Sequence, residues 1–446
     1  MSVKQSGSDN QQRLNAVPLE DISDYLGRED ALAILGVKRE TLYTYVSRGL
    51  IRSIQLPGTN ARQFSRDDIS QLRLRHRIRE GSASPGEGSM RWGTPVVESM
   101  ITQISERGPV YREHSAIELA RSGLSFESVS EFLWSASLPS KHANWPAVAQ
   151  LSSKLDFLKS FDRSNNILQI FSHAVIALTR ETEDVAADRG AEKFVCARQL
   201  MVALTRCCGW LSADQSFDDV EMQERTARKV ARLLGIATTD ETISALDTAL
   251  ILCADFELAP GTFAARIAAS AGADMSACIV AGICAHSGKF AGGGIIQTES
   301  LLFDNLTGEN RKTRLNLARD YGDRLFGFNH PLFPKGDPRA RELISSAKRF
   351  AKNDYELHAA FEFLHEAETQ YDLKPGIGIA LLLLCRALVM PRQSALAIWT
   401  LGRTAGLIAH IIEQRSLRYK IRPRAHYIGS KGMLRDTPLN SDKYKK

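Results

Sequence analysis

Apolar residues recur at helical spacing along most of this 446-residue chain, and the alternation that is typical of strands is scarce. The pattern therefore predicts a mainly α protein. Thr262–Ile283 is rich in Ala and contains no Pro, which predicts a closely packed helix. The glycines at 292–294 follow it and predict a turn. Ser125 and Glu127 precede apolar residues at helical spacing, as in a capped amphipathic helix.

A compact pattern near the N-terminus differs from the rest of the chain. Its predicted elements are, in order, a helix at Arg28–Leu35, a break at Gly36, a helix at Arg39–Arg48 closed by Gly49, a hairpin over Ile51–Phe64 around Pro57-Gly58, and a basic helix at Asp67–Arg79. Helix, glycine turn, helix and hairpin are the parts of a winged helix-turn-helix domain, which we place at residues 21–80.

Positive charge is concentrated in the same region. The chain has a formal net charge of +6, and residues 28–80 hold eleven Arg and Lys against six Asp and Glu. A basic helix can enter a DNA major groove, with some side chains on phosphates and others on base edges. The candidate DNA-binding residues are Lys38, Arg39, Thr41, Tyr43, Thr44, Arg48 and Arg62. We expect Arg73, Arg75 and Arg77 to add phosphate contacts.

The segment GVKRETLYTYVSRGLI, residues 36–51, resembles the DNA-binding head of the MerR and excisionase-like groups. The resemblance implies double-stranded DNA as a partner. The residues themselves also allow a protein-interaction module with a solvated basic face. Residues 1–20 are polar and expected to be disordered, and the Gly/Ser/Pro-rich residues 81–92 are expected to form a linker.

Cysteine usage and the lengths of apolar runs bear on the compartment. The seven cysteines show no CxxC and no metal-type spacing, which favours reduced thiols in a cytoplasm and no metal site. The N-terminus lacks the apolar core of a signal peptide. Ile377–Met390 is too short for a membrane span and contains Arg386, so we expect a buried helix there. The prediction is a cytoplasmic protein with no membrane partner.

The larger part of the chain resembles the citrate synthase family, from about Gly93 to Gly429. CADFELAPGTFAAR at residues 253–266 is similar to HADHE–N–ST–FTAR, and SGKFAGGGI at 287–295 is similar to SGPLHGGAN. GFNHPLFPKGDPRA at 327–340 is similar to GFGHRVYK–DPRA. Further similar segments are YREHSAIELARSGLSFESVSEFLWSASLP at 111–139, WTLGRTAGLIAH at 399–410 and IRPRAHYIG at 421–429.

The resemblance implies a two-domain helical fold that forms a homodimer. The large domain is expected at 93–292 and 389–430, the small domain at 293–388, and a polar tail at 431–446. Two heads on a two-fold axis would suit a palindromic DNA site. No covalently bound cofactor is expected. The implied ligands are an acyl-CoA, as substrate or effector, and a di- or tricarboxylate.

The family condenses acetyl-CoA with oxaloacetate through a carboxylate base and two histidines that act as hydrogen-bond donors. By the resemblance, His330 is the retained catalytic histidine and Lys335 is a cofactor-binding residue. Arg339 and Arg403 would bind substrate carboxylates. The arginine lent to the partner subunit's site would be Arg422 or Arg424.

Three reactive positions of the family are changed in this chain. Phe256 stands at the oxaloacetate-binding histidine, Ala291 at a catalytic histidine and Gly378 at the catalytic aspartate. Asp372 lies six residues before Gly378 and cannot take over without a change of the backbone. His286 is an alternative donor, although a shift of five residues from Ala291 would normally face it elsewhere.

These residues leave three functions open. The first is a DNA-binding regulator whose body senses an acyl-CoA or a carboxylate. The second is an active acyltransferase of the citrate synthase type, acting in the tricarboxylic acid cycle, with a changed substrate or a displaced base. The third is an inactive partner subunit of a true citrate synthase.

Overall fold

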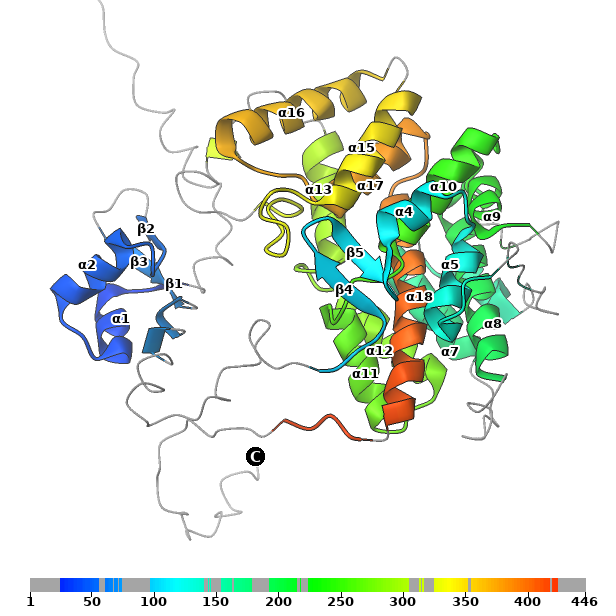
Figure 1. Cartoon of the computed structure of the whole chain (residues 1–446). Coiled ribbons are helices and arrows are strands. Elements are labelled where there is room, and N and C mark those ends of the chain that lie inside the picture. Colours follow the sequence, from blue (N-terminus) through cyan, green and yellow to red (C-terminus); the bar gives the residue numbers. More distant parts are fainter. Residues whose placement is uncertain are drawn as a thin grey trace, which may run out of the picture. The chain divides into compact units, whose positions relative to one another are not determined.

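The computed structural model describes residues 25–55, 61–66, 68–70, 72–73, 97–139, 143, 145, 154–162, 164–178, 192–214, 217, 224–304, 313, 315–316, 325–351, 354–417 and 419–423. The chain divides into an N-terminal unit, residues 1–96 with 422–446, and a body, residues 97–421 (Figure 1). The expected N-terminal disorder, the linker, the polar tail, Arg75, Arg77 and Arg424 lie outside the described residues.

The N-terminal unit packs two short helices on a three-stranded antiparallel sheet. Its elements are β1 (Tyr25–Leu26), α1 (Arg28–Leu35), α2 (Arg39–Ser47), β2 (Ser53–Gln55) and β3 (Arg62–Ser65). The strand order is β1-β3-β2, so β3 lies in the middle of the sheet and pairs with both β1 and β2. Gly36 ends α1 in the left-handed conformation, with φ of 64°, as the predicted break requires.

A small apolar core joins these elements. Leu42, Ile51 and Phe64 are almost fully buried in it. The predicted third helix is described only in part, with Ile69 and Leu72 in helical backbone and packed into the same core. Arg52 in turn bonds Asp68 through two nitrogens at 2.8 Å, which ties the start of that helix to the strand region. Two helix predictions therefore hold to within a residue.

The body begins with a short antiparallel sheet that the apolar pattern did not predict. It consists of β4 (Thr102–Ser105), β5 (Gly108–Tyr111) and β6 (His114–Ser115). The strands are only two to four residues long, so they carry too little alternation to be recognised. Tyr111 at the end of β5 is fully buried and brings the sheet onto the helices behind it.

The other elements of the described body are helices, as predicted. Its helices are α4 (Ala116–Arg121), α5 (Phe126–Ser135), η3 (Asp156–Ser160), α7 (Ile167–Leu178), α8 (Glu192–Cys207), η5 (Cys208–Leu211), α9 (Thr226–Leu233), α10 (Asp240–Cys253), α11 (Pro260–Ser270), α12 (Met275–His286), α13 (Gly293–Phe303), α15 (Pro338–Phe350), α16 (Tyr355–Tyr371), α17 (Ile377–Ala387) and α18 (Ser394–Leu417). Ser125 caps α5 as expected, because its side chain accepts from Ser128 N.

The longest of these helices, α18, forms the centre of the core. It contacts α11 and α12 on one side and α5, α7 and α8 on the other (Figure 1). Its length and composition would suffice to cross a membrane, but 89% of its most apolar window is buried inside the body. A helix that is buried on most of its sides is typical of the centre of a large helical core.

Two sequence predictions in this region were wrong in detail. The stretch Thr262–Ile283 is not one helix, because the chain turns at Gly272 with φ of 88°. Asp274 then caps a new helix by accepting from Ala277 N at 2.7 Å. Of the glycines at 292–294, only Gly292 lies in a turn, since Gly293 and Gly294 are the first residues of α13. A Cβ on Gly292 would lie 2.6 Å from Trp399, so these glycines serve close packing.

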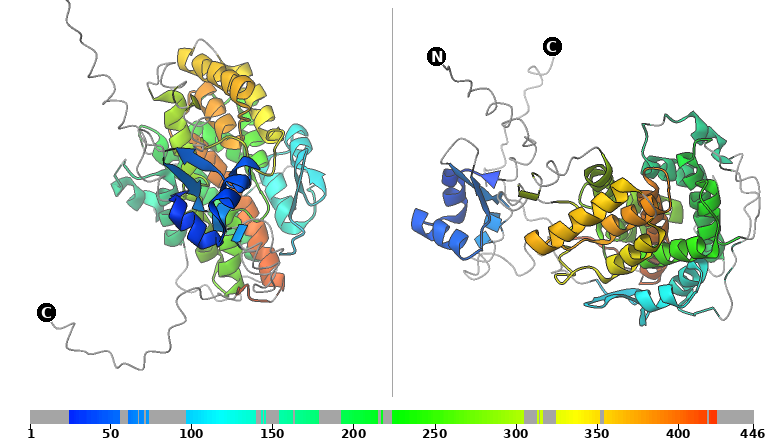
Figure 2. Two further views of the ribbon diagram at one scale, coloured as in Figure 1. Left: turned by 90° about the vertical axis from the view of Figure 1, so that its left-hand side faces the viewer. Right: turned by 90° about the horizontal axis from the view of Figure 1, so that it is seen from above.

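A second group of helices lies at one end of the body. In this group α15 packs on α17, and α13 and α16 both contact α17 (Figure 2). They come from the segment predicted as a small domain, residues 293–388. The group is attached through α17 and α13 to α18 and through α15 to α10. The exact limits of a small domain stay a prediction.

Candidate active site

The loop that carries His330 has a constrained backbone. Gly327 and Asn329 both adopt positive φ, at 86° and 50°. Asn329 is held from two directions, because its N donates to Lys374 O at 2.9 Å and its Oδ1 accepts from Lys374 N at 2.7 Å. Gly376 N also donates to Gly327 O at 2.7 Å. The start of α17 therefore fixes the loop, and left-handed residues of this kind gather at functional sites.

His330 is half-buried, and its tautomer follows from its surroundings. Leu332 N donates to His330 Nδ1 at 3.2 Å, so the proton of the neutral ring sits on Nε2. Burial, and after it the positive charge of Arg339, lower the pKa of His330 below its ordinary value. The ring is thus a neutral donor at pH 7, which is what stabilising an enolate oxygen requires.

Two phenylalanines surround this histidine. The ring of Phe256 meets His330 edge to face, with centroids 5.1 Å apart and planes at 89°. The ring centroid of Phe333 lies 5.9 Å from that of His330 and 5.8 Å from that of Phe256. We call Phe256, His330 and Phe333 the aromatic cluster. It places an apolar ring where the resemblance expects a second hydrogen-bonding histidine.

Arg339 lies against the aromatic cluster at the start of α15. Its guanidinium carbon is 4.1 Å from the centre of the Phe256 ring, a cation–π contact. Asp337 also binds Arg339 through both carboxylate oxygens, at 3.0 and 2.8 Å. Burial acts to lower the pKa of Arg339, but Asp337 outweighs it and raises that pKa. The buried arginine is charged, and an acid of the same turn already pairs with it.

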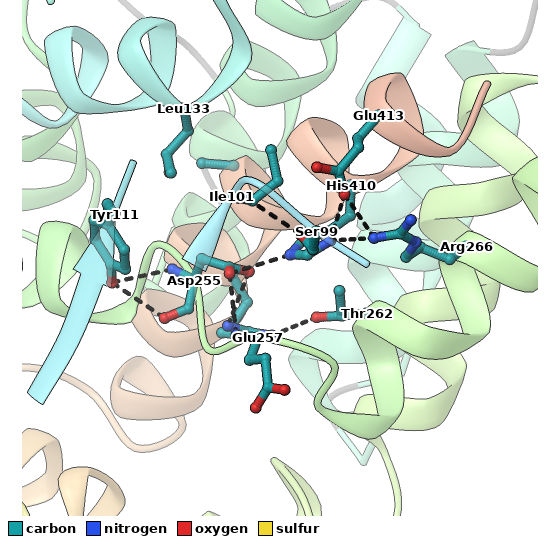
Figure 3. A network of polar contacts seen from close by, with 12 residues as sticks. Ser99, Ile101, Tyr111, Leu133, Asp255, Glu257, Thr262, Arg266, His410 and Glu413 are labelled. Carbon is teal, nitrogen blue, oxygen red and sulfur yellow. Dashed lines mark hydrogen bonds and ion pairs between the residues drawn. The ribbon is translucent and has the colours of Figure 1, made fainter. Parts of the chain in front are cut away.

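Arg403, the other expected clamp, belongs to a buried polar network. Figure 3 labels other members of this network, among them Asp255, Thr262 and His410. It donates to Thr262 Oγ1 at 2.6 Å and to Asp255 Oδ1 at 3.4 Å. Asp255 Oδ2 in turn accepts from His410 Nε2 at 3.2 Å. Burial would raise the pKa of Asp255, but His410 and Arg403 outweigh burial and hold that pKa at about 2. Asp255 is therefore ionised inside the core.

The same network continues to the far end of α18. Arg266 donates to Glu413 Oε2 at 2.6 Å and to Gln414 Oε1 at 3.0 Å, and its NH1 lies 3.3 Å from His410 Nδ1. We call Arg403, Asp255, His410, Arg266 and Glu413 the Asp255 network. Two arginines are matched by two carboxylates, so the buried charges balance. Figure 3 shows the Glu257 carboxylate turned away from these groups.

The three changed family positions lie on segments that meet. Phe256 contacts His330 directly. Gly378 is the second residue of α17, and a Cβ there would lie 3.3 Å from Ile295 Cγ1, on the helix that follows Ala291. The starts of α13 and α17 are therefore in contact, and Phe256 meets the loop of His330. No carboxylate or imidazole stands at the three positions.

The remaining candidates have exposed side chains. Lys335 is on the surface, with its Nζ 3.2 Å from Glu106. Arg422 is exposed. Asp372 ends α16 with its side chain 89% exposed and bound to Lys374, so it is directed to solvent. Among the described residues, no group of three His, Cys, Asp or Glu is placed to hold a metal ion.

The DNA-binding candidates are distributed over α2 and β3. Lys38, Arg39, Thr44, Arg48 and Arg62 are exposed. Two others are half-buried, Thr41 and Tyr43, and the Tyr43 ring packs edge-on against Phe64 at 6.0 Å. In the described part of the chain, no carboxylate forms an ion pair with Lys38, Arg39 or Arg48. Tyr43 is thus chiefly a core residue.

Sequence reasoning missed the partners of the arginines. Asp337 and Asp255 were matched to the family pattern but given no role, and His410 closed a matched segment without one. His410 inside the apolar pattern of residues 399–410 was the available signal, because a buried polar group needs a partner. Phe333 and Thr262 carried no comparable signal.

Comparison with known proteins supplies the family. The model of the citrate synthase C-terminal domain matches residues 89–424. Citrate synthase 2 of Bacillus subtilis is 24% identical over 357 residues, which cover 76% of this chain and 94% of that protein. The citrate synthase of Saccharolobus solfataricus is 32% identical over 202 residues, 43% of this chain and 53% of that protein. For several curated relatives the match spans about half of their length. In the putative citrate synthase 2 of Mycobacterium tuberculosis, for example, it covers 52% of that protein.

Solved structures agree with this in fold. A citrate synthase of Thermoplasma acidophilum, in a ternary complex with carboxymethyl coenzyme A and oxaloacetate, superposes with a TM-score of 0.63 at 21% identity. The superposition covers 75% of this chain and 94% of the Thermoplasma acidophilum chain. The Thermotoga maritima citrate synthase gives 0.63 at 20% identity, over 78% of this chain and 97% of its own.

Proposed function

This chain belongs to the citrate synthase family, and we propose that it is a DNA-binding regulator whose body binds an acyl-CoA or a di- or tricarboxylate without condensing them. The proposal rests on one observation. Phe256, Ala291 and Gly378 occupy the positions of two donors and the base, while the buried arginines 339 and 403 remain. Binding and reaction are separable, because only groups that act in the transition state speed the reaction.

Three aspartates of the described residues are not available as a substitute base. Asp337 is bound to Arg339 through both of its oxygens, and Asp255 is enclosed by Arg403 and His410. Asp372 faces solvent. A general base contributes about 10²–10⁴ in rate, and an enolate donor about 10²–10³, so both losses together leave little of the family mechanism.

The arginines support retained binding. A guanidinium has five donors, and the described contacts of Arg339 and Arg403 use only some of them. A carboxylate is the matching ligand, because it accepts two parallel N–H bonds. We propose that Lys335 contacts the phosphates of an acyl-CoA at the surface, and that Arg422 or Arg424 is lent to the partner subunit.

The outer faces of α11 and α12 support a homodimer. The outward positions are small or apolar: Phe263, Ala264, Ile267, Ala268, Ala277, Val280, Ala281 and Cys284. The two helices carry one Asp, Glu, Lys or Arg between them, Arg266, and that side chain is fully buried. A helix pair whose outer face carries no charge favours contact with a second apolar surface over exposure to water.

The N-terminal unit supports DNA binding. Lys38, Arg39 and Arg48 project from one helix region without acid partners in the described chain, which leaves their charges for phosphates. A labelled 30-base-pair duplex of mixed sequence tests this by fluorescence anisotropy. We expect binding with a Kd of about 10⁻⁴–10⁻⁶ M that weakens steeply with salt.

A matched pair of variants makes the DNA test specific. Arg39→Ala with Arg48→Ala should weaken binding and flatten the salt dependence, since two phosphate contacts are removed. Arg107→Ala, an exposed arginine of the body, is the control and should change neither quantity. Binding that is unaffected by the double variant would contradict DNA recognition by α2.

An active acyltransferase remains the second candidate, and the tautomer of His330 favours it. That ring is a neutral Nε2–H donor beside a buried arginine, as enolate stabilisation requires. Thiol release from acetyl-CoA with oxaloacetate tests this function, with propionyl-CoA and pyruvate as alternative substrates. Turnover lost in His330→Ala would establish the enzyme. The third candidate, an inactive partner subunit, predicts a stoichiometric complex with a true citrate synthase on co-purification.

A further inference from the structure

The side of α2 that faces away from the core carries a line of polar side chains. Leu42 of this helix is fully buried in the core of the N-terminal unit. Glu40, Thr44 and Ser47 are exposed, and their spacing places them in line on the opposite side of the helix. We call these three residues the polar ridge. In a helix that enters a major groove, the side opposite its own core is the side that meets the base edges.

The two hydroxyl groups of the polar ridge have already given their hydrogens to the helix backbone. Thr44 Oγ1 donates to Glu40 O at 2.8 Å, and Ser47 Oγ donates to Thr44 O at 3.0 Å. A hydroxyl has one hydrogen, so each oxygen is left with lone pairs only. Both side chains can therefore accept a hydrogen bond from a base but cannot donate one.

The third member of the polar ridge, Glu40, is also an acceptor. A glutamate carboxylate accepts hydrogen bonds and donates none when it is ionised. Within the described part of the chain, this carboxylate forms no ion pair and no hydrogen bond. The polar ridge therefore presents acceptors alone, and its strongest acceptor has no partner.

Cations lie beside the polar ridge. Lys38, Arg39 and Arg48 are exposed, and the guanidinium carbon of Arg39 is 5.7 Å from the centre of the Tyr43 ring. Such cations bind the phosphates of DNA, whatever the base sequence. A phosphate repels a carboxylate, so Glu40 is better matched to a base edge inside the groove.

A surface made of acceptors distinguishes the four bases of DNA. In the major groove, guanine presents two acceptors, and thymine presents one acceptor and a methyl group, so neither offers a donor. Adenine offers its N6 amino group but holds the acceptor N7 beside it. Cytosine offers the N4 amino group alone. Cytosine is therefore the base that matches Glu40.

We infer that Glu40 is a specificity-determining residue that accepts a hydrogen bond from the N4 amino group of a cytosine in the DNA major groove. This rests on the proposed DNA-binding function of the N-terminal unit, and it names the kind of DNA site that the unit recognises. The neighbouring cations supply affinity for any sequence, whereas Glu40 supplies the choice of base. A preferred site thus holds a cytosine at one fixed position.

Selection from a pool of duplexes with a randomised centre tests the inference on the full-length protein. The wild type should enrich duplexes that hold cytosine at one position and should deplete guanine there. Fluorescence anisotropy then compares the enriched duplex with a copy in which guanine replaces that cytosine. We expect the copy to bind about tenfold more weakly, the usual effect of one mismatched base contact.

Two variants change the chemistry of Glu40 without changing the core. In Glu40→Gln, the side-chain amide can bond both N6 and N7 of adenine, so the preference should move from cytosine to adenine. Glu40→Ala should bind the two duplexes with affinities that agree within about twofold, because the contact with the base is removed.

Glu29→Gln is the matched control. Glu29 and Glu40 are both exposed and are both the second residue of their helix, where an acid also favours the helix dipole. The control removes the same charge from the same unit, and it should keep the preference for cytosine. A role of Glu40 in the helix dipole alone would leave the choice of base unchanged in all three variants.

The possible results separate this inference from the proposed function. A cytosine preference that survives in Glu40→Gln and Glu40→Ala, or one that is lost equally in Glu29→Gln, would overturn the role of Glu40 alone. Binding of the wild type without any preference for cytosine would do the same and would leave DNA binding in place. Absence of binding to every duplex would overturn both the inference and the proposed DNA-binding function.

Discussion

Asp255 and Phe256 are neighbours in the chain, yet they belong to two regions of opposite chemistry. In the Asp255 network, two arginines meet two carboxylates, and every member is bound to another. In the aromatic cluster next to it, the apolar ring of Phe256 covers Arg339, at a position where the resemblance implies a histidine. We expect the network to stabilise the folded state, whereas the groups that the resemblance implies at the three changed positions would bind the substrate and its transition state. Stability and catalysis can therefore be lost independently of each other.

The largest expected effect comes from breaking the network. Asp255→Ala leaves Arg403 and His410 buried without their acid, which should lower the free energy of unfolding by about 3–5 kcal/mol. Urea unfolding measures this. Asp240→Ala is the matched control, because its side chain is 99% exposed beside Arg228 and should leave the urea midpoint unchanged. Similar midpoints for the two variants would contradict the role of the network.

The pH dependence of the same pair follows from its charge. The folded-state pKa of Asp255, about 2, lies below the ordinary 3.8, so its stabilising contribution is present above pH 4. That contribution is lost as the pH falls from about 4 to 2. The wild type should therefore lose stability in that window, and Asp255→Ala should lose less.

Restoring the reactive groups is the second way to test the comparison. Phe256→His, Ala291→His and Gly378→Asp are combined with Ile295→Ala, since Ile295 lies 3.3 Å from the new Cβ. We expect thiol release from acetyl-CoA with oxaloacetate to rise by about 10²-fold or more over the wild type. The same background with Gly378→Asn lacks the base and should stay at the wild-type rate. Equal rates in the two backgrounds would show that the scaffold no longer positions a base.

A second buried carboxylate sharpens the contrast with Asp255. Asp247 accepts from Phe126 N at 3.0 Å, but burial and the nearby Glu127 raise its pKa to about 7. Since the unfolded pKa is 3.8, this group contributes stability below pH 4 that is lost as the pH rises to 7. Asp247→Asn keeps the acceptor without the charge, so it should add about 2 kcal/mol at pH 8 and less at pH 5. A gain that is larger at pH 5 would contradict this assignment.

The smallest expected effect concerns the ring over Arg339. Phe256→Leu removes the cation–π contact and should lower the free energy of unfolding by about 1 kcal/mol beyond the loss of apolar area. Phe157→Leu is the control, because Phe157 is 41% exposed and no cation lies over its ring in the described part of the chain. Thermal melting of the two variants measures the difference. If they melt alike, the contact between Phe256 and Arg339 adds nothing to stability.

The sequence predicted those elements whose ends are marked by local chemistry. Gly36 and Ser125 terminate or cap their helices through interactions within a few residues, and both were placed correctly. Gly272 was missed as a helix break, because one glycine among alanines is compatible with a continuous helix until Asp274 caps the next. The strands β4–β6 were too short to show alternation.

Predictions for the site were limited by distance along the chain. The family pattern brought Phe256 and His330 into one pocket, and their rings do meet. It did not reveal that Arg403 pairs with Asp255, 148 residues away. Such pairing depends on how α11 and α18 cross, which no local spacing specifies. The unmet polar atoms of His286 likewise appear only when its surroundings are known.

One measurement tests the central proposal, that the body binds its ligands without condensing them. Calorimetry with oxaloacetate and acetyl-CoA is run beside thiol release on the same full-length protein. We expect saturable heat of binding for at least one ligand and no thiol release above background. Release at an ordinary enzyme rate, about 1–10³ s⁻¹, that disappears in His330→Ala would contradict the proposal and identify an active enzyme.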